Sequence, residues 1–155
     1  MIIDLSPSMQ ERVAEWELGY LTASIDCEGS ICIESEKSGT HLHALVCISN
    51  TKLTFLEFLQ KGFGGKIIVK SNRDQFKTQA YELRWFGYSA KPVLQLIVND
   101  LVIKKEQAKL YLQFPLHKVR SEYTTEETLL RKEIFLKMKT LNKRNFVKIT
   151  VEEIK

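Results

Sequence analysis

Residues 19–31 read GYLTASIDCEGSI, a pattern that joins a helix to a strand. The small side chains at positions 19 and 22–24 would let this helix approach a partner's backbone closely. Asp26 and Glu28 place carboxylates at the C-terminal end of the helix, where the macrodipole disfavours negative charge. This placement fits a cation bound nearby, but it also fits a hydrated helix end with two exposed acids. Gly29 is a typical residue for ending the helix.

On both sides of this stretch, helical and alternating patterns follow one another. Ser8 with Glu11 and Thr124 with Glu127 are capping-box pairs that predict the starts of the first and last helices. Pro115 stops the helix before it. The predicted elements are, in order, helix 9–27, strands 30–36 and 41–49 with the turn KSGT between them, helix 52–61, strands 66–70 and 79–86, a helix over 90–114 that is interrupted near 101–103, and a last helix ending near residue 141. The candidate N-caps of helix 52–61 are Ser49, Asn50 and Thr51.

This order predicts an α+β fold, α-ββ-α-ββ-α-α, with four mostly antiparallel strands and helices on one face of the sheet. A length of 155 residues corresponds to about one domain. We therefore expect a single domain over 1–155, with a core over about 8–115 and a helical extension over about 116–155.

The two faces of the predicted sheet differ in character. One face is apolar and covered by helices, whereas the other carries a mixture of His, Glu, Lys and Arg. Such a face can simply be solvated. It also suits the reading of base edges, because Arg and Lys donate to guanine and Glu accepts from cytosine.

Composition excludes several classes of protein. Apolar residues make up 44% and charged residues 27%, which is too apolar for a disordered chain. No apolar run approaches the roughly 20 residues that span a bilayer, and the N-terminal residues lack the pattern of a signal peptide. We therefore expect neither secretion nor membrane insertion. The net charge of +4 lies in the last forty residues, since the first 115 are balanced; it permits a polyanionic partner without requiring one.

Three cysteines, Cys27, Cys32 and Cys47, form no CxxC pair. The simplest interpretation is that they are small, buried thiols in a reducing compartment. A zinc site built from Cys27, Cys32, His41 and His43 is a weaker alternative, because the spacing matches no common zinc pattern.

Residues 19–31 closely resemble the motif of the LAGLIDADG homing endonucleases. Leu21, Ile25, Asp26 and Gly29 match the consensus letters, and Ser30-Ile31 is a frequent continuation. Glu28 stands where the second aspartate of the motif usually lies. The positions that depart from the consensus are Thr22, Ala23, Ser24 and Cys27.

Three further segments resemble the same family in the expected order. Asn50-Thr51 is similar to its polar position near the cleavage site, and Gly64-Gly65-Lys66-Ile67 to the glycine turn that opens its third strand. Residues 101–108, LVIKKEQA, are similar to the helix from which a lysine, here Lys104, reaches the active site. Together the four segments cover roughly residues 15–115.

A single copy of the motif implies a homodimer, because single-motif members pack their motif helices at a two-fold axis beneath a saddle-shaped sheet. The residues expected at this interface are Gly19, Tyr20, Thr22, Ala23 and Asp26, with Asp26 mainly structural. Two-fold symmetry further predicts a pseudo-palindromic target.

The resemblance implies a site-specific, Mg²⁺-dependent endonuclease for double-stranded DNA, and the short chain favours an intron over an intein as its origin. Glu28 would bind the metal with the backbone carbonyl of Cys27, since hard oxygen ligands suit Mg²⁺; Mn²⁺ or Ca²⁺ could substitute for binding. Asn50 would orient the attacking water, and Lys104 would stabilise developing negative charge. We expect an intracellular location, in the cytoplasm and nucleoid or in an organelle.

DNA contacts are expected from residues that alternate outward along the four strands. They are Ser30, Cys32, Glu34, Glu36, Ser38, His41, His43, Lys66, Ile68, Lys70, Glu82 and Arg84. The last helix could hold the flanking backbone, or present an ordinary solvated face, with the basic residues Arg131, Lys132, Lys137, Lys139, Lys143 and Arg144.

Three other functions remain open on the sequence. The fold also serves maturases that bind their own intron RNA, for which Glu28 would be dispensable. A catalytically inactive DNA-binding descendant would keep the basic surface without cleavage. A generic α+β binding module that does not bind nucleic acid is disfavoured by the four matching segments.

Overall fold

A computed structural model describes residues 14–37, 39, 41–71, 78–118 and 121–143. Its elements are α2 (Glu15–Glu28), β1 (Gly29–Ser35), β2 (Leu42–Asn50), α3 (Leu53–Phe63), β3 (Lys66–Val69), β4 (Tyr81–Phe86), the 3₁₀ turn η1 (Gly87–Ser89), α4 (Ala90–Ile97), α5 (Lys105–Gln113) and α6 (Thr125–Leu141). The predicted order α-ββ-α-ββ-α-α is therefore confirmed, with η1 as a short addition before α4.

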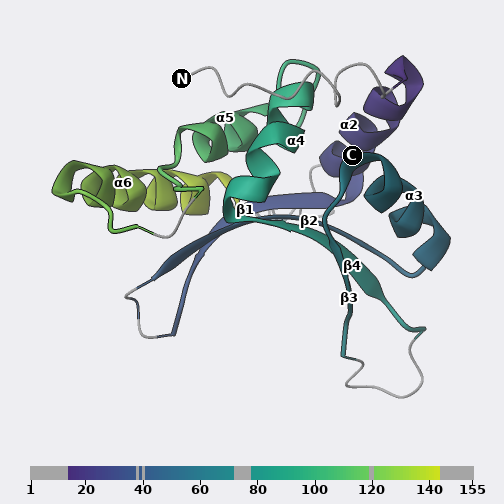
Figure 1. Ribbon diagram of the computed structural model, residues 1–155, viewed down its shortest axis with the longest axis horizontal. Helices are drawn as coiled ribbons and strands as arrows, with labels where there is room; N and C mark the ends of the chain where they lie inside the picture. The colour runs from purple at the N-terminus through teal and green to yellow at the C-terminus, as the bar shows by residue number, and fades with distance from the viewer. Residues whose placement is uncertain (1–13, 38, 40, 72–77, 119–120, 144–155) are drawn as a thin grey trace, which may run out of the picture.

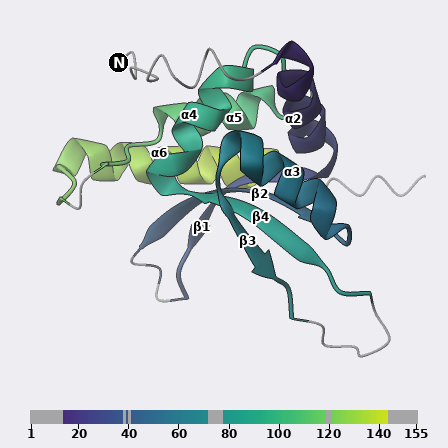
Figure 2. The same cartoon turned by 45° about the vertical axis from the view of Figure 1, so that its right-hand side comes forward.

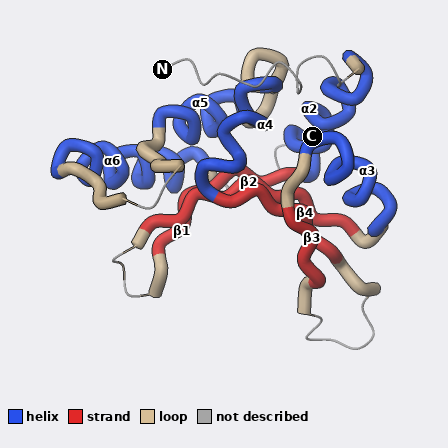
Figure 3. Tube along the Cα trace, in the orientation of Figure 1, coloured by secondary structure: helices blue, strands red, loops and turns tan. Residues whose placement is uncertain are grey.

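The four strands form one antiparallel sheet in the order β1-β2-β4-β3. Figure 1 shows the helices on one face of this sheet, and Figure 3 shows both hairpins bending away from them. From a second direction the β3–β4 hairpin again extends away from the helices (Figure 2). The sheet thus has one covered face and one face free of helices among the described residues; we call the latter the outer face.

Strand register keeps apolar side chains on the covered face. Ile31 pairs with Val46, and Ile48 pairs with Leu83, so every second residue of each strand contributes to one core. All four of these side chains are 0–1% exposed. The helices add the fully buried residues Leu21, Ile25, Leu56, Leu59, Leu94, Ile97, Tyr111 and Phe114.

The turn between α3 and β3 is locked by close backbone approach. Gly65 has a φ of +93°, a conformation that favours glycine, and an added Cβ would lie 2.9 Å from Leu83 Cδ1 and 3.0 Å from the Arg84 carbonyl oxygen. The indole Nε1 of the buried Trp85 donates to the Phe63 carbonyl at 3.0 Å. The predicted glycine turn is therefore confirmed at Gly64 and Gly65, whereas Gly62 lies within α3.

Several predicted helix ends differ from the observed ones. The Ser8 capping box and residues 9–13 lie outside the described residues; within them α2 begins after Ala14, whose N–H donates to Glu17. The N-caps predicted for α3 were wrong, because Lys52 occupies that position without a side-chain cap. Asn50 instead accepts the Lys52 N–H through its side-chain oxygen, at 2.8 Å.

The predicted start and interruption of the C-terminal helices are confirmed. The Thr124 hydroxyl accepts the Glu127 N–H at 3.2 Å, and the Glu127 carboxylate accepts the Thr124 N–H at 2.9 Å. Residues 101–104 separate the helical segments α4 and α5. In the described part of the chain, no helix combines the length and apolarity needed to cross a bilayer.

Candidate active site and DNA-binding face

Glu28 and Asn50 meet where α2 and β2 end. Gly29 pairs with Ile48 in the sheet, so the last residue of α2 lies beside the end of β2. The Asn50 amide Nδ2 donates to Glu28 Oε2 at 2.8 Å, while Asn50 Oδ1 accepts from the Lys52 backbone. These two bonds fix the orientation of the Asn50 amide. The Glu28 side chain is exposed, so its other oxygen faces solvent or a ligand.

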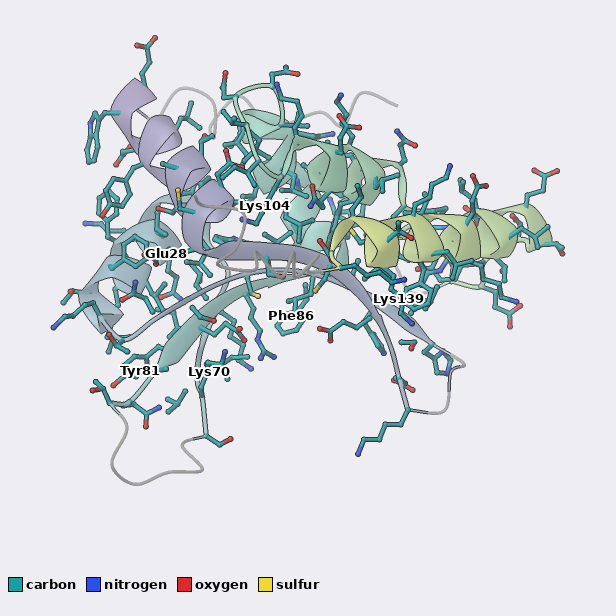
Figure 4. The ribbon with its side chains drawn as sticks, turned by 180° about the vertical axis from the view of Figure 1, so that it is seen from behind. Glu28, Lys70, Tyr81, Phe86, Lys104 and Lys139 are labelled. Carbon is teal, nitrogen blue, oxygen red and sulfur yellow. The ribbon has the colours of Figure 1, made fainter. Side chains whose placement is uncertain are left out.

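Lys104 lies at the same end of α2 but contacts a different residue. Figure 4 places both Glu28 and Lys104 near the end of α2 that leads into β1. The Lys104 ammonium donates to the Asp26 backbone carbonyl, two residues before Glu28. The structure therefore brings the three predicted catalytic residues to one end of one helix, with Lys104 tied to the helix backbone.

Asp26 anchors the start of α5. Its carboxylate, 7% exposed, accepts backbone N–H groups from Val102 at 2.7 Å, Ile103 at 3.2 Å and Lys104 at 2.9 Å. These N–H groups belong to the segment that leads into α5, whose N-cap is Lys104, so the buried carboxylate holds this segment against the end of α2. The place of Asp26 at a dimer interface stays a prediction.

The donor set at the end of α2 suits a hard cation only in part. Glu28 supplies a carboxylate, and the carbonyl of Cys27 belongs to the last turn of α2, where carbonyls lack intrahelical partners. Both are oxygen donors of the kind Mg²⁺ prefers. Across the described residues, no three His, Cys, Asp or Glu side chains gather as they would around a metal. The described residues of one chain therefore offer two oxygen donors of this kind, fewer than a complete set of metal ligands.

The zinc alternative finds no support in the geometry. Cys27, Cys32, His41 and His43 do not form such a group. Burial raises the pKa of Cys32 to about 11 and that of Cys47 to about 12. The prediction of buried thiols is confirmed for Cys47, whereas Cys32 is half-buried and Cys27 is exposed, so the prediction was wrong for Cys27.

An open apolar groove of about 740 Å³ runs along α2. Its wall on one side is the small-residue face of α2, including Gly19 and Ala23, and on the other the 101–104 segment. Val102 is 86% and Ile103 66% exposed there, which is unusual for two adjacent branched apolar residues. This surface has the composition of a protein–protein contact.

The residues predicted at the dimer interface separate into two groups. Gly19 and Ala23 are exposed along this groove, and Asp26 lines it. Thr22 also lines the groove but is largely buried, and its hydroxyl donates to the Leu18 carbonyl at 2.7 Å. Tyr20 is half exposed and packs edge-on against two phenylalanines of α3.

The outer face of the sheet carries most of the residues predicted to contact DNA. Exposed or half-buried on the strands and their ends are Ser30, Cys32, Glu34, Glu36, His41, His43, Lys66, Ile68, Lys70 and Arg84. His43 bonds Glu36 at 2.8 Å. Ser38 lies outside the described residues. Glu82 differs from expectation, because it is only 6% exposed and its carboxylate is already bonded to three side chains.

Solved structures of DNA-bound homing endonucleases resemble this chain over most of its length. The chain matches homing endonuclease I-CvuI, crystallised with its DNA target and Ca, with a TM-score of 0.64 and 21% identity over 90% of both chains. It also matches the archaeal intron-encoded homing endonuclease I-Vdi141I bound to DNA, with a TM-score of 0.66 and 14% identity over 90% of this chain and 92% of that one. The chain has the LAGLIDADG endonuclease fold.

A third matching structure comes from a longer chain, of which this chain covers less than half. The LAGLIDADG homing endonuclease I-LtrWI, bound to target DNA, matches with a TM-score of 0.60 and 16% identity over 81% of this chain but 45% of its own length. One copy of this chain thus corresponds to the whole of I-CvuI and to about half of I-LtrWI. No family model matches the sequence, and no curated protein matches it.

Three residues of the outer face are absent from the predicted DNA contacts, although alternation along the strand predicts that one of them, Leu45, faces outward. Ser49 pairs with Glu82, and Leu45 pairs with Phe86, which places Ser49, Leu45 and Phe86 beside the predicted DNA contacts. Phe86 is 48% exposed and lies under Arg84, 5.9 Å from its guanidinium (Figure 4). Alternation along the strands could have predicted these outward positions. Phe86 follows the outward Arg84 by two residues, and Leu45 and Ser49 follow the outward His43 by two and six residues.

Only some of the basic residues in the C-terminal helix α6 are exposed enough to contact DNA phosphates. Arg131 is 9% exposed and donates to the Pro115 carbonyl and to the Leu42 carbonyl, the latter at 2.9 Å. Its guanidinium stacks 3.9 Å from the Tyr123 ring. Arg131 is therefore a structural residue rather than a phosphate contact. The exposed basic residues of α6 are Lys132, Lys137 and Lys139, of which Figure 4 labels Lys139. Lys143 follows the helix, and Arg144 lies outside the described residues.

Proposed function

We propose that this chain is a site-specific, Mg²⁺-dependent endonuclease that cuts double-stranded DNA as a homodimer, encoded within an intron. The observation that carries the proposal is the exposed Glu28 carboxylate, oriented by Asn50 at the end of the small-residue helix α2. DNA is bound to the matching solved structures of I-CvuI, I-Vdi141I and I-LtrWI.

The homodimer follows from the incomplete metal site and from the groove along α2. Pairing two α2 helices through Gly19 and Ala23 would cover Val102 and Ile103 and bring the two Glu28 carboxylates toward one another. A two-fold axis at this seam would also join two outer faces into one long surface. The target would then be pseudo-palindromic.

In this mechanism Glu28 and the Cys27 carbonyl would hold Mg²⁺, and the ion would supply activation of a water and neutralisation of charge on the phosphate. Asn50 can donate one amide hydrogen to Glu28 and keep the second for a water. Lys104 places a positive charge at the same end of α2, where it would stabilise the negative charge that develops on the phosphate. Asp26 holds the segment that carries Lys104.

The test is cleavage of a randomised duplex library with Mg²⁺ by the wild type, Glu28→Gln and Glu57→Gln. Glu57 is an exposed acid on α3 and serves as the charge control. We expect the wild type and Glu57→Gln to cut at one pseudo-palindromic site. Glu28→Gln should bind that site and cut it slower by a factor on the order of 10² or more, because metal assistance is worth several kcal/mol.

Cleavage by Glu28→Gln at near the wild-type rate would remove Glu28 from the mechanism. A folded, dimeric wild type that binds a selected DNA without cutting it would instead indicate an inactive DNA-binding protein. Failure to select any DNA would lead to intron RNA as the next ligand to test.

A further inference from the structure

Three strands meet at the Glu82 carboxylate in the middle of the outer face. Register pairs Glu82 with Ser49 of β2 and with Ile68 of β3. The Lys70 N–H bonds the Ala80 carbonyl at 2.9 Å, which carries the β3–β4 pairing one step beyond the strand ends. Ser49, Lys70 and Arg84 therefore surround Glu82 on the same side of the sheet.

Both oxygens of Glu82 are occupied. Oε1 accepts from Ser49 Oγ at 2.9 Å and from Lys70 Nζ at 3.5 Å. Oε2 accepts from Nε and Nη2 of Arg84. The Glu82 side chain is only 8% exposed, compared with 43% for Lys70 and 31% for Arg84. The carboxylate thus lies beneath two cations that remain accessible from the open side.

The Glu82 carboxylate is ionised at neutral pH, which maintains its bonds to Ser49, Lys70 and Arg84. Burial alone would raise the pKa of Glu82, but hydrogen bonds from Arg84 and Ser49, with the positive charges of Arg84 and Lys70, lower it below its ordinary value. An ionised carboxylate accepts hydrogen bonds and donates none. A cytosine amino group could reach Glu82 only by displacing one of these partners.

We infer that Glu82 is a positioning residue, which sets the direction of Arg84 and Lys70 for reading guanine and does not itself contact bases. This inference rests on the proposed recognition of DNA. Arg84 binds Glu82 through its Nε side, so the N–H groups at the far end of its planar guanidinium remain free. Two parallel donors of this kind match guanine N7 and O6, the commonest specific contact in the major groove.

Removing the carboxylate should change specificity more than affinity. In Glu82→Gln, Arg84 and Lys70 would lose their anchoring charge and turn to DNA phosphates, which carry no sequence information. Binding to unrelated DNA should therefore tighten, while preference for guanine at the Arg84 position of each half-site should fall at least about fivefold. A variant damaged only in its fold would instead bind every sequence more weakly.

The experiment selects randomised duplexes by binding in Ca²⁺, so that its result does not depend on cleavage. The variants are Glu82→Gln, Arg84→Ala and the double substitution, with Glu57→Gln as a control that removes one carboxylate from the exposed surface of α3, away from the outer face. If Glu82 acts through Arg84, the double variant should show the same base preferences as Arg84→Ala alone. Glu57→Gln should leave the guanine preference at the Arg84 position unchanged.

The outcomes separate this inference from the proposed function. A wild type that selects a sequence, with Glu82→Gln selecting the same bases equally strongly, would overturn the inference and leave DNA recognition intact. A change of preference at a second base in the double variant would also overturn it, because Glu82 would then read a base directly. A wild type that selects no sequence would overturn both. If Glu82→Gln does not fold, Glu82→Asp retracts the carboxylate by one methylene and supports the same comparison.

Discussion

Asp26 and Lys104 bind each other reciprocally across 78 residues of sequence. The Asp26 carboxylate accepts the Lys104 backbone N–H at 2.9 Å, and the Lys104 ammonium donates to the Asp26 backbone carbonyl. This pair ties the end of α2 to the start of α5. The position of Lys104 near Glu28 therefore depends on a carboxylate that is itself buried.

Asp26→Ala should destabilise the chain by about 1–3 kcal/mol, because three backbone N–H groups lose a charged acceptor. Urea unfolding at fixed protein concentration measures the effect. Glu106→Gln, an exposed acid in the first turn of the same helix, is the control and should change the free energy of unfolding by less than about 0.5 kcal/mol. Equal effects of the two substitutions would contradict the anchoring role of Asp26.

Arg131→Met should lower the free energy of unfolding by about 2–4 kcal/mol, since two carbonyls lose a donor and two aromatic rings lose a stacked cation. Arg131→Lys should recover little, because an ammonium lacks the planar fork. The adjacent, exposed Lys132→Ala should have almost no effect on stability. If Arg131→Met unfolds like the wild type but binds DNA more weakly, Arg131 is a phosphate contact after all.

Gly65→Ala and Gly62→Ala should shift stability in opposite directions. Gly65 combines a positive φ with contacts of 2.9–3.0 Å for an added Cβ, so alanine should cost about 1–3 kcal/mol. Gly62 lies in helix α3 with nothing within 4 Å of the added Cβ, so alanine there should stabilise by about 0.5–1 kcal/mol. Thermal unfolding of the two variants compares them directly, and a shift of the same sign in both would refute this account of the turn.

Acid should weaken the folded state partly through Glu82. Its pKa is lower in the folded chain than in the unfolded one, so its stabilisation is complete above the unfolded pKa and disappears as pH falls through the folded pKa. Glu82→Gln cannot titrate and should show a smaller loss of stability between about pH 5 and pH 3. Denaturant unfolding over this pH range, with Glu34→Gln in parallel, tests whether the difference belongs to Glu82.

Ile103→Glu should convert the proposed dimer into monomers. The side chain is 66% exposed in the single chain and borders the groove along α2, so a charge there would be buried at a two-fold seam without a partner. Sedimentation equilibrium reads the association state. Leu129→Glu changes an equally exposed apolar residue on α6 and should remain dimeric. A dimer that tolerates Ile103→Glu would place the interface elsewhere.

Local sequence patterns were sufficient to predict most of the helices and strands. Alternation identified the covered face of all four strands, including Ile31, Val46 and Leu83, because a period of two reports which side of a strand is apolar. Capping chemistry located the start of α6 at Thr124. The N-caps predicted for α3 were wrong. Asn50 has a side chain suited to an N-cap, but its amide is bound to Glu28 and to the Lys52 backbone instead.

The sequence by itself determined the order of helices and strands, the apolar face of the sheet, and the placement of Asp26, Glu28 and Lys104 on segments that resemble one nuclease family. These properties depend on neighbours within a few residues, which the chain records directly. Tertiary structure alone decided that Glu82 and Arg131 are buried, and that Glu28 meets Asn50. Arg131, for example, binds the Leu42 carbonyl 89 residues away. Such contacts follow from strand register and from how helices pack on the sheet, and neither is encoded in the local periodicity of either partner.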